Sequence, residues 1–584
     1  MKRYLLTTAD EKTWKINQPV LFLGVWCKKF NREKIWSKLD SRLAEPFIEN
    51  RGTNNDHDYL EVLSNQLLTE LTDSLNVFHN ESHSSRYWDI LIGHWLRQYL
   101  KVIINRYRTI ESVVNNSGIS GTSVYKSTQS DLVTSDTSEF QSIINNSTWN
   151  SILFAKILSN FKEIDFPINV LDIDYEVELF SKKYSTSRKK RALIFCASLL
   201  NKVHRKSDAF ITKSYLSFFN EIKLQLSLIQ LPQRWITPVI DITEINLEDR
   251  SRFSVDWDGY EGLEKVARRL LVEMLPICYL EGYKSIVEQV NEFSWPKNPK
   301  FIFTSNSFAY NEGFKFWTAA KVEAGVPYYV GQHGTDYGTN RESVNYTELR
   351  TCDKFISWGW TDAYQNVDVV PAFNFRTISF KSENYNKKGR LLLVKRGPGQ
   401  HDGPYDRQYQ HQVYQQDMLS FYDCFPSHIK SSFVVRLHHG SSNKETESSD
   451  SLMWNRHSKN IDLDTGEEPI NNLIVKSRIV VITYDSGAIL ELLNLNVPVV
   501  CFWRGGLDHL LEDAIPFYEL LIDAGIIYQS LEEAAKHITN SWDDLDSWWG
   551  SEKVQNARKV FCYKYSNKVN SPILSLRKLL LDNL

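Results

Sequence analysis

The chain has 584 residues, which allows about four average domains, or two large ones, at roughly 150 residues per domain. Its 68 Lys and Arg residues nearly balance its 71 Asp and Glu residues, and this argues against a nucleic-acid protein held by bulk positive charge. Aromatic residues make up 13% of the chain, so it can bury a large core and offer flat rings to bases or sugars.

The sequence indicates no membrane span and no metal site. It contains no run of about 18 uninterrupted apolar residues, and charge follows the short N-terminal apolar run at once, which argues against a secretory signal. The seven cysteines are scattered, without a C-x-x-C pair, as is typical of reduced thiols. Zinc and calcium motifs such as H-E-x-x-H and D-x-D-x-D are absent. We therefore expect a cytoplasmic protein.

The N-terminal region predicts strands followed by long helices. Residues 4–8 and 20–27 are strand-like, and the second run is nearly all apolar, as in a strand covered on both faces. Helical patterns follow at 58–76 and 86–109. The second helix has a wide aromatic face, for which we favour core packing over a ligand site. This face includes Tyr87, Trp88, Trp95 and Tyr99.

Two N-terminal segments lack a clear period. Residues 111–148 are rich in Ser, Thr and Asn and predict a loop or insertion. Residues 207–256 carry prolines and mixed charge and predict an irregular connection.

From residue 300 onward, strands and helices alternate. Strands are predicted at 300–306, 326–334, 353–359, 390–399, 432–439, 478–486 and 497–503. Helices are predicted at 311–324, 407–424, 468–477 and 487–495. This alternation predicts parallel sheets with helices on both faces, in which ligands bind at the carboxyl ends of the strands. Residues 360–388 carry Pro371 and a polar stretch, and they predict a linker between two domains.

The clearest candidate site follows the strand at 478–486. Thr483, Ser486 and Gly487 form a small polar turn, and a helix begins at once. The first amides of such a helix lack intrahelical partners and can bind a phosphate. Glu491, one turn further along, could accept a hydrogen bond from ribose hydroxyls. The alternative is that Thr483 and Ser486 only cap the helix.

Cations end two further strands of the same half. Arg436 can pair with a phosphate or carboxylate in a fork geometry, and His438 could donate to a departing phosphate. Lys395, Arg396 and Gly397 place two cations beside a glycine turn, which suits an anionic ligand. The alternatives are surface histidines on a turn and a solvated turn. The Walker loop, the G-x-S-x-G elbow and a G-x-G-x-x-G fingerprint after the opening strands are absent.

The preceding half offers candidate bases. Glu312 and Lys315 lie three apart near a helix start, where Glu312 could act as general base or nucleophile, or could simply face water. His333 stands between glycines after a strand, so we expect it to be exposed and to bind an acceptor or a sugar carboxylate. Asp336 is a second candidate base. The candidate acceptor- or sugar-binding residues are Asn306, Lys315, Gln332 and Gly334.

Several segments together resemble a bacterial family of transferases from surface-polysaccharide gene clusters. They are LLTTADEKTW with LFLGVWC, YWDILIGHWL, NEGFKFW, QHGTDYG and TYDSGAILELLNLNVPVVCFW. The resemblance runs along nearly the whole chain.

Residues 390–503 also look like the second domain of GT-B glycosyltransferases that use CMP-activated acidic sugars, such as sialyl- and Kdo-transferases. In those enzymes a His-Pro pair at a strand end contacts the cytidine phosphate, and a Ser/Thr turn before a helix holds it. Residues 436–439 stand where the pair is expected, with His439 in place of the proline. Residues 483–486 would be the phosphate turn, and Glu491 the nucleotide-side carboxylate.

The resemblance implies an α/β fold of the GT-B-like kind, with two Rossmann-like domains whose parallel sheets face a central cleft, plus C-terminal helices. Residues 1–380 would form the acceptor-side domain with helical insertions. Residues 381–550 would form the nucleotide-sugar domain, and residues 551–584 would be helices that pack back.

The implied function is transfer of an acidic sugar, a nonulosonic acid or a Kdo-like sugar, from a CMP donor to a surface glycan without a cofactor or metal. Cations and helix amides would stabilise the departing CMP, and Glu312, Asp336 or His333 would take the acceptor proton. Alternatives are a UDP- or GDP-sugar donor, or a non-catalytic glycan-binding or assembly protein. Peripheral contact with the inner membrane or with glycan-assembly machinery, the anomeric stereochemistry and the oligomeric state are left open.

Overall fold

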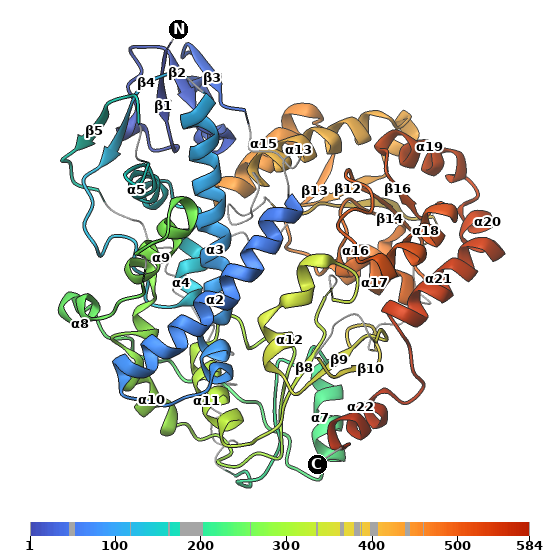
Figure 1. Cartoon of the computed structure of the whole chain (residues 1–584). Helices are drawn as coiled ribbons and strands as arrows, with labels where there is room; N and C mark the ends of the chain where they lie inside the picture. The colour runs from blue at the N-terminus through green and yellow to red at the C-terminus, as the bar shows by residue number, and fades with distance from the viewer. Residues whose placement is uncertain are drawn as a thin grey trace.

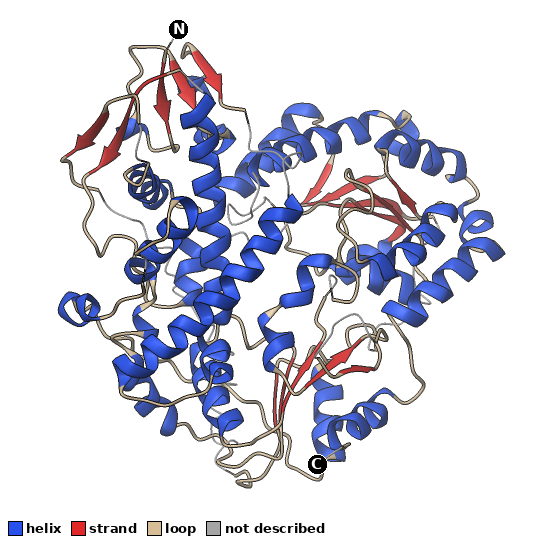
Figure 2. Ribbon diagram, in the orientation of Figure 1, coloured by secondary structure: helices blue, strands red, loops and turns tan. Residues whose placement is uncertain are grey.

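The described residues form three all-parallel β-sheets with surrounding helices (Figures 1 and 2). This computed structural model describes residues 2–45, 53–116, 118–161, 164–175, 203–256, 258–334, 337–361, 367–378, 386, 388–397, 407–437, 444–459 and 461–582.

The first sheet has the strand order β3-β2-β1-β4-β5. Its strands are β1 (Arg3–Leu6), β2 (Val20–Phe22), β3 (Ser41–Leu43), β4 (Ile119–Tyr125) and β5 (Ile168–Leu171). The central strands β1 and β2 are almost entirely buried, because helices and loops cover both faces of a parallel sheet.

The second sheet has the order β10-β9-β8-β7-β6, so its strands follow the sequence from one edge to the other. They are β6 (Phe210–Thr212), β7 (Ile302–Thr304), β8 (Tyr328–Gly331), β9 (Lys354–Ser357) and β10 (Val369–Pro371). Pro371 ends the edge strand β10, a position that requires no ladder hydrogen bond from its nitrogen.

The third sheet has the order β13-β12-β11-β14-β15-β16. Its strands are β11 (Arg390–Val394), β12 (Phe433–Arg436), β13 (Asp462–Asp464), β14 (Ser477–Ile482), β15 (Val499–Phe502) and β16 (Ile527–Tyr528). Numbered from β11, this is the doubly wound order 3-2-1-4-5-6.

Helices fill the connections between the strands. Those up to the third sheet are α1 (Glu33–Trp36), α2 (Thr53–His79), α3 (Ser85–Asn116), α4 (Thr137–Ile143), α5 (Ser147–Leu158), α7 (Phe218–Ser227), α8 (Leu247–Arg252), α9 (Gly262–Met274), α10 (Tyr283–Asn291), α11 (Glu312–Glu323) and α12 (Thr347–Thr351). Those that follow are α13 (Arg407–Asp423), α14 (Ser427–Lys430), α15 (Lys444–His457), α16 (Ile470–Lys476), α17 (Gly487–Asn494), α18 (Ile515–Asp523), α19 (Leu531–Ser541), α20 (Leu545–Trp549), α21 (Glu552–Tyr565) and α22 (Pro572–Leu581).

The long helix α3 joins the first two sheets. It packs against α5 beside the first sheet and against α11 and α12 beside the second (Figure 1). The aromatic face predicted on this helix is buried, which confirms that it serves the core. Its members Tyr87, Trp88, Trp95 and Tyr99 are each at most 3% exposed.

The C-terminal helices divide between two sheets. Helix α21 packs against α17 and α18 beside the third sheet, and α22 packs against α7 beside the second (Figure 1). Between them, the Asn567 amide donates to the Trp358 carbonyl at 2.7 Å, and the Asn374 amide donates to the Asn567 carbonyl at 3.0 Å. The chain therefore returns from the third sheet to the second.

The α/β class, the parallel sheets and the C-terminal helices are confirmed, but the N-terminal region expected to hold one sheet holds two. The segment 111–148, predicted as a loop, contains the interior strand β4, because the hydroxyl side chains of this strand find partners inside the sheet. The Thr122 hydroxyl donates to the Leu5 carbonyl at 2.9 Å, and the Ser123 hydroxyl lies 2.7 Å from the Tyr4 hydroxyl. Strand β10 lies in the predicted linker at 360–388.

The segments 2–45, 53–116, 118–161 and the later described residues contain no helix with the length and apolarity needed to cross a bilayer. The six described cysteines are free thiols.

We expect the packing of α22 to stabilise the second sheet. Leu576 is 0% exposed and lies in a cluster with residues of β6, β7 and β8, whereas Leu574 on the same helix is 63% exposed. Leu576→Ala should lower the free energy of unfolding by about 2–5 kcal/mol, because it leaves a cavity. Urea denaturation followed by tryptophan fluorescence measures this. Leu574→Ala is the control, and an equal effect of both variants would contradict the packing role of α22.

Candidate functional site

The strand order of the third sheet creates a switch point. From β11 the chain builds outward through β12 and β13 on one side, and through β14, β15 and β16 on the other. Val394 is paired with Ile482, so the segments that follow β11 and β14 leave the sheet side by side. In open α/β sheets this crevice at the carboxyl ends binds ligands.

Tyr414 of α13 ties these two strand ends together. The Arg396 amide donates to the Tyr414 hydroxyl at 2.9 Å, and that hydroxyl lies 2.5 Å from the Thr483 hydroxyl, which donates to the Val394 carbonyl at 3.1 Å. The Arg396 guanidinium lies 4.6 Å from the centre of the Tyr414 ring. Burial raises the pKa of Tyr414, which keeps this linking hydroxyl neutral. Thr483 thus holds the ends of β11 and β14 together at the crevice.

Helix α17 begins directly at the switch point. Ser486 is its N-cap residue, and the Ser486 side chain makes no capping hydrogen bond. Asp485 is held on the other side, where its carboxylate accepts from the Tyr518 hydroxyl at 3.0 Å and lies 3.0 Å from Nε2 of His509. The positive end of the α17 dipole therefore points at the crevice through Ser486 and Gly487.

Two of the predicted donor-binding cations are paired inside the protein. The Lys395 side chain is 0% exposed, and its Nζ lies 2.9 Å from Oδ2 of Asp450. Burial lowers the pKa of Lys395, and the Asp450 carboxylate acts against this shift. Arg436 pairs with Asp464 and donates to the Glu468 carbonyl at 2.6 Å. His438 lies outside the described residues.

The carboxyl ends of the second sheet carry a second polar group, here called the His333 cluster: Tyr215, Asn306, His333 and Arg376. These residues follow β6, β7, β8 and β10. Asn306 Nδ2 donates to the Tyr215 hydroxyl at 3.0 Å, and the Tyr215 and His333 rings lie 5.8 Å apart. Strand ends therefore bring together side chains that are far apart in the sequence.

Arg376 joins the His333 cluster to the third sheet. Its Nε lies 2.9 Å from Oε1 of Glu491 on α17, and its guanidinium lies 5.5 Å from the Tyr215 ring. Burial raises the pKa of Glu491, and the Arg376 charge acts against this shift. The predicted residues Asn306, His333 and Glu491 thus lie around an arginine that the sequence analysis missed.

The backbone before Tyr215 has an unusual conformation. Lys213 and Tyr215 have φ angles of 44° and 61°, in the left-handed region that bulky residues rarely adopt. Such strained residues gather at functional sites. Sequence reasoning missed Tyr215 because the segment 207–256 has no hydrophobic period that would show a strand end.

His333 is a neutral imidazole at neutral pH. Burial lowers its pKa to about 4, and the Arg376 charge adds to this shift. Its Nδ1 lies 3.1 Å from the Tyr337 hydroxyl. A side chain at Gly334 would meet no atom within 4 Å, so open space borders this loop. A neutral imidazole beside open space can accept a proton. Asp336 lies outside the described residues.

Gln332, by contrast, is a structural residue of this edge. It is buried, its Nε2 donates to the Gly334 carbonyl at 2.8 Å, and its Oε1 accepts from the Trp358 amide and the Trp360 indole at 2.8 and 2.9 Å. It therefore joins the loops after β8 and β9.

Glu312 and Lys315 lie together in the core, in the first turn of α11. Their side chains are 5% and 0% exposed, and Nζ of Lys315 lies 2.9 Å from Oε2 of Glu312. The Tyr279 hydroxyl donates to the same Glu312 oxygen at 2.7 Å, and the Thr137 hydroxyl lies 2.7 Å from that of Tyr279. This burial favours a packing role for both predicted residues.

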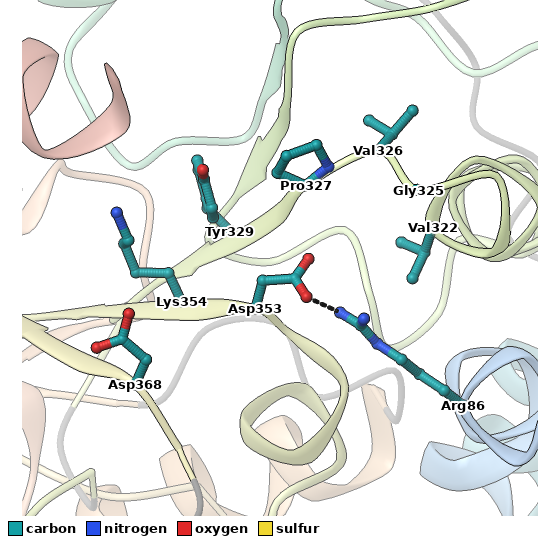
Figure 3. A pocket seen from close by; sticks show the side chains of 9 residues that line it. All are labelled: Arg86, Val322, Gly325, Val326, Pro327, Tyr329, Asp353, Lys354 and Asp368. Carbon is teal, nitrogen blue, oxygen red and sulfur yellow. Dashed lines mark ion pairs between the residues drawn. The ribbon is translucent and has the colours of Figure 1, made fainter. Parts of the chain in front are cut away.

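Two cavities lie at the opposite ends of the strands. One of about 280 Å³ borders the starts of β8, β9 and β10, where Arg86 forms an ion pair with Asp353 at 2.8 Å (Figure 3). Another of about 620 Å³ borders the starts of β11, β12, β13 and β14. Because ligands of parallel sheets bind at carboxyl ends, we place the candidate site at the switch point and the His333 cluster. Among the described residues, no group of three His, Cys, Asp or Glu could hold a metal ion.

We expect Lys395 to stabilise the fold through Asp450. Lys395→Met should lower the free energy of unfolding by about 3–5 kcal/mol, because it leaves a buried carboxylate without its cation. Lys395→Met combined with Asp450→Leu should recover much of this loss in urea denaturation. A Lys395→Met variant of normal stability that binds nucleotide poorly would instead indicate that Lys395 contacts the ligand.

Comparison with known proteins places the chain in a family. No curated protein matches its sequence. Solved structures that match include Acinetobacter baumannii MurG, with 10% identity, 67% of this chain and 94% of that chain covered, and a TM-score of 0.31. A glycosyltransferase from Rickettsia africae ESF-5 has 12% identity, 65% and 100% coverage, and a TM-score of 0.33. A co-structure of S. aureus MnaA with UDP has 11% identity, 79% and 96% coverage, and a TM-score of 0.33. The family model described as LIC12162 family transferase matches residues 3–580, so the chain belongs to this transferase family.

Proposed function

We propose that the chain is a glycosyltransferase of GT-B-like arrangement. The third sheet binds the nucleotide sugar at its switch point, and the second sheet presents the acceptor. The contact between the two carboxyl edges carries this proposal: Arg376 pairs with Glu491 across them, and neutral His333 lies in the same cluster.

The donor phosphate would lie against the start of α17. The amides of Gly487 and Ala488, the Arg396 guanidinium and the small residue Gly397 suit an anion that gains charge as it departs. Thr483 links the ends of β14 and β11 through its bond to the Val394 carbonyl, and Lys395 is anchored by Asp450 of α15. Glu491 would orient the nucleotide side of the donor through its ion pair with Arg376.

Arg376 favours an acidic sugar. Its side chain is 42% exposed, so its guanidinium can also reach a ligand carboxylate in a fork geometry. We therefore propose a CMP-activated nonulosonic acid or Kdo-like sugar as the donor and a surface glycan as the acceptor. A UDP- or GDP-sugar at the same site is the alternative donor.

His333 would act as the general base. As the acceptor oxygen forms its bond to the anomeric carbon, the bond from that carbon to the nucleotide phosphate breaks. The phosphate keeps the electron pair, and His333 takes the acceptor proton. This single displacement inverts the anomeric carbon.

Nucleotide titration tests the donor. CMP at 100 times its dissociation constant should stabilise the protein by about 2.7 kcal/mol, because it binds only the folded chain. Thermal unfolding with CMP, UDP and GDP measures this. A shift with UDP but none with CMP would reject the CMP donor, and no shift with any of the three would favour a non-catalytic glycan-binding protein.

The base assignment predicts both a rate loss and a pH profile. His333→Asn should slow nucleotide release about 10²- to 10⁴-fold, whereas His457→Asn, a surface variant on α15, should not. Since the pKa of His333 is lowered to about 4, His333 is already neutral near pH 5. kcat/KM should therefore stay level down to about pH 5 and fall only as the pH approaches 4. A fall centred near the ordinary histidine pKa of about 6.5 would contradict the assignment.

A further inference from the structure

Tyr337 and Glu348 form a buried hydrogen-bonded pair next to His333, and the proposed reaction does not use them. The Tyr337 hydroxyl lies 3.1 Å from Nδ1 of His333 and 2.5 Å from Oε1 of Glu348 on α12. Tyr337 and Glu348 are 3% and 4% exposed. His333, Tyr337 and Glu348 thus form a chain of hydrogen bonds that runs from the end of β8 into the core.

The neighbours of Tyr337 fix the position of its side chain between His333 and Glu348. Gly338 follows it with a φ of 74°, and a Cβ there would lie 2.4 Å from the Trp360 ring, so only glycine fits. The Tyr337 ring packs at 5.1 Å on Phe355 and at 5.5 Å on Tyr346. The hydroxyl therefore has a fixed position.

The hydroxyl proton decides the direction of both bonds. A tyrosine hydroxyl has one proton, and an ionised carboxylate can only accept. The Tyr337 hydroxyl donates to Oε1 of Glu348, so its single proton is used in that bond. The Tyr337 oxygen can then only accept in its bond with His333, so the His333 atom that faces it at 3.1 Å is a protonated Nδ1.

The surroundings of Glu348 include several charged or titratable groups. Burial raises the pKa of Glu348, and the Tyr337 hydrogen bond and the charges of Arg97 and Arg350 lower it. His94 lies on the far side, with Nε2 at 3.5 Å from Oε2 of Glu348, and burial keeps the pKa of His94 well below its usual range. His94 is therefore neutral at neutral pH and adds no charge beside the carboxylate.

We propose that Tyr337 and Glu348 are positioning residues that hold His333 in the tautomer with its proton on Nδ1. Nε2 then carries the lone pair and is the nitrogen that takes the acceptor proton. The role of Nε2 rests on the function proposed above, whereas the tautomer follows from the hydrogen bonds alone. A base fixed in one tautomer needs no proton rearrangement before each turnover.

Nitrogen-15 NMR of the full chain labelled at histidine reads the tautomer directly. His333→Asn identifies the His333 ring signals among those of the 14 histidines. At neutral pH we expect a protonated Nδ1 and an unprotonated Nε2. A protonated Nε2 in the wild-type chain would overturn the proposal, and this result needs no further variant.

Tyr337→Phe removes the acceptor for Nδ1–H, so we expect the unprotonated signal to move from Nε2 to Nδ1. Tyr329→Phe, which alters another buried tyrosine of the same strand region, should leave the His333 signals unchanged. An unchanged tautomer in Tyr337→Phe would contradict the positioning role. The spectrum requires no donor or acceptor. The expected tautomer in a chain without nucleotide release would therefore support this inference while contradicting the glycosyltransferase.

Discussion

The meeting of two carboxyl edges is the constraint on which the candidate site depends. In a parallel sheet all the carboxyl ends of the strands lie along one edge. Here the carboxyl edges of the second and third sheets are in contact. Arg376 pairs with Glu491 across them. Backbone bonds add to this contact: the Leu511 amide donates to the Thr339 carbonyl at 2.8 Å, and the Arg341 amide to the His509 carbonyl at 3.1 Å. The proposed base on the second sheet and the proposed phosphate site on the third can thus serve one reaction.

The remaining parts of the chain support this arrangement. Helix α3 connects the first sheet to the helices beside the second, and α22 returns from the third sheet to pack beside the second. The short helix Val25–Cys27, which follows β2, contacts α13, the helix that carries Tyr414. All three sheets therefore lie against the segments that shape the site. Much of the aromatic excess serves the cores that join them, as Trp88 and Trp95 show.

Sequence patterns predicted four of the six strands of the third sheet, because apolar strands such as 477–482 alternate there with helices. They missed the short edge strands β13 and β16, which have only three and two residues. They failed at β4, because the hydroxyls of Thr122 and Ser123 bond to β1, more than a hundred residues away in the sequence. The spacing of Glu312 and Lys315 predicted their proximity. It could not show their burial, which depends on Tyr279 and Thr137 from distant segments. Arg376 follows an edge strand hidden in a polar stretch, so no local pattern marks it.

Hydrogen–deuterium exchange with saturating nucleotide tests most directly whether the site lies where the carboxyl edges meet. Peptides that cover 483–490 and the strand ends at 213–215 and 332–334 should exchange more slowly with nucleotide bound, because the ligand would cover the start of α17 and close the contact with the His333 cluster. Protection confined to 431–434 and 462–468, which border the cavity of about 620 Å³ at the opposite ends of the strands, would contradict the account.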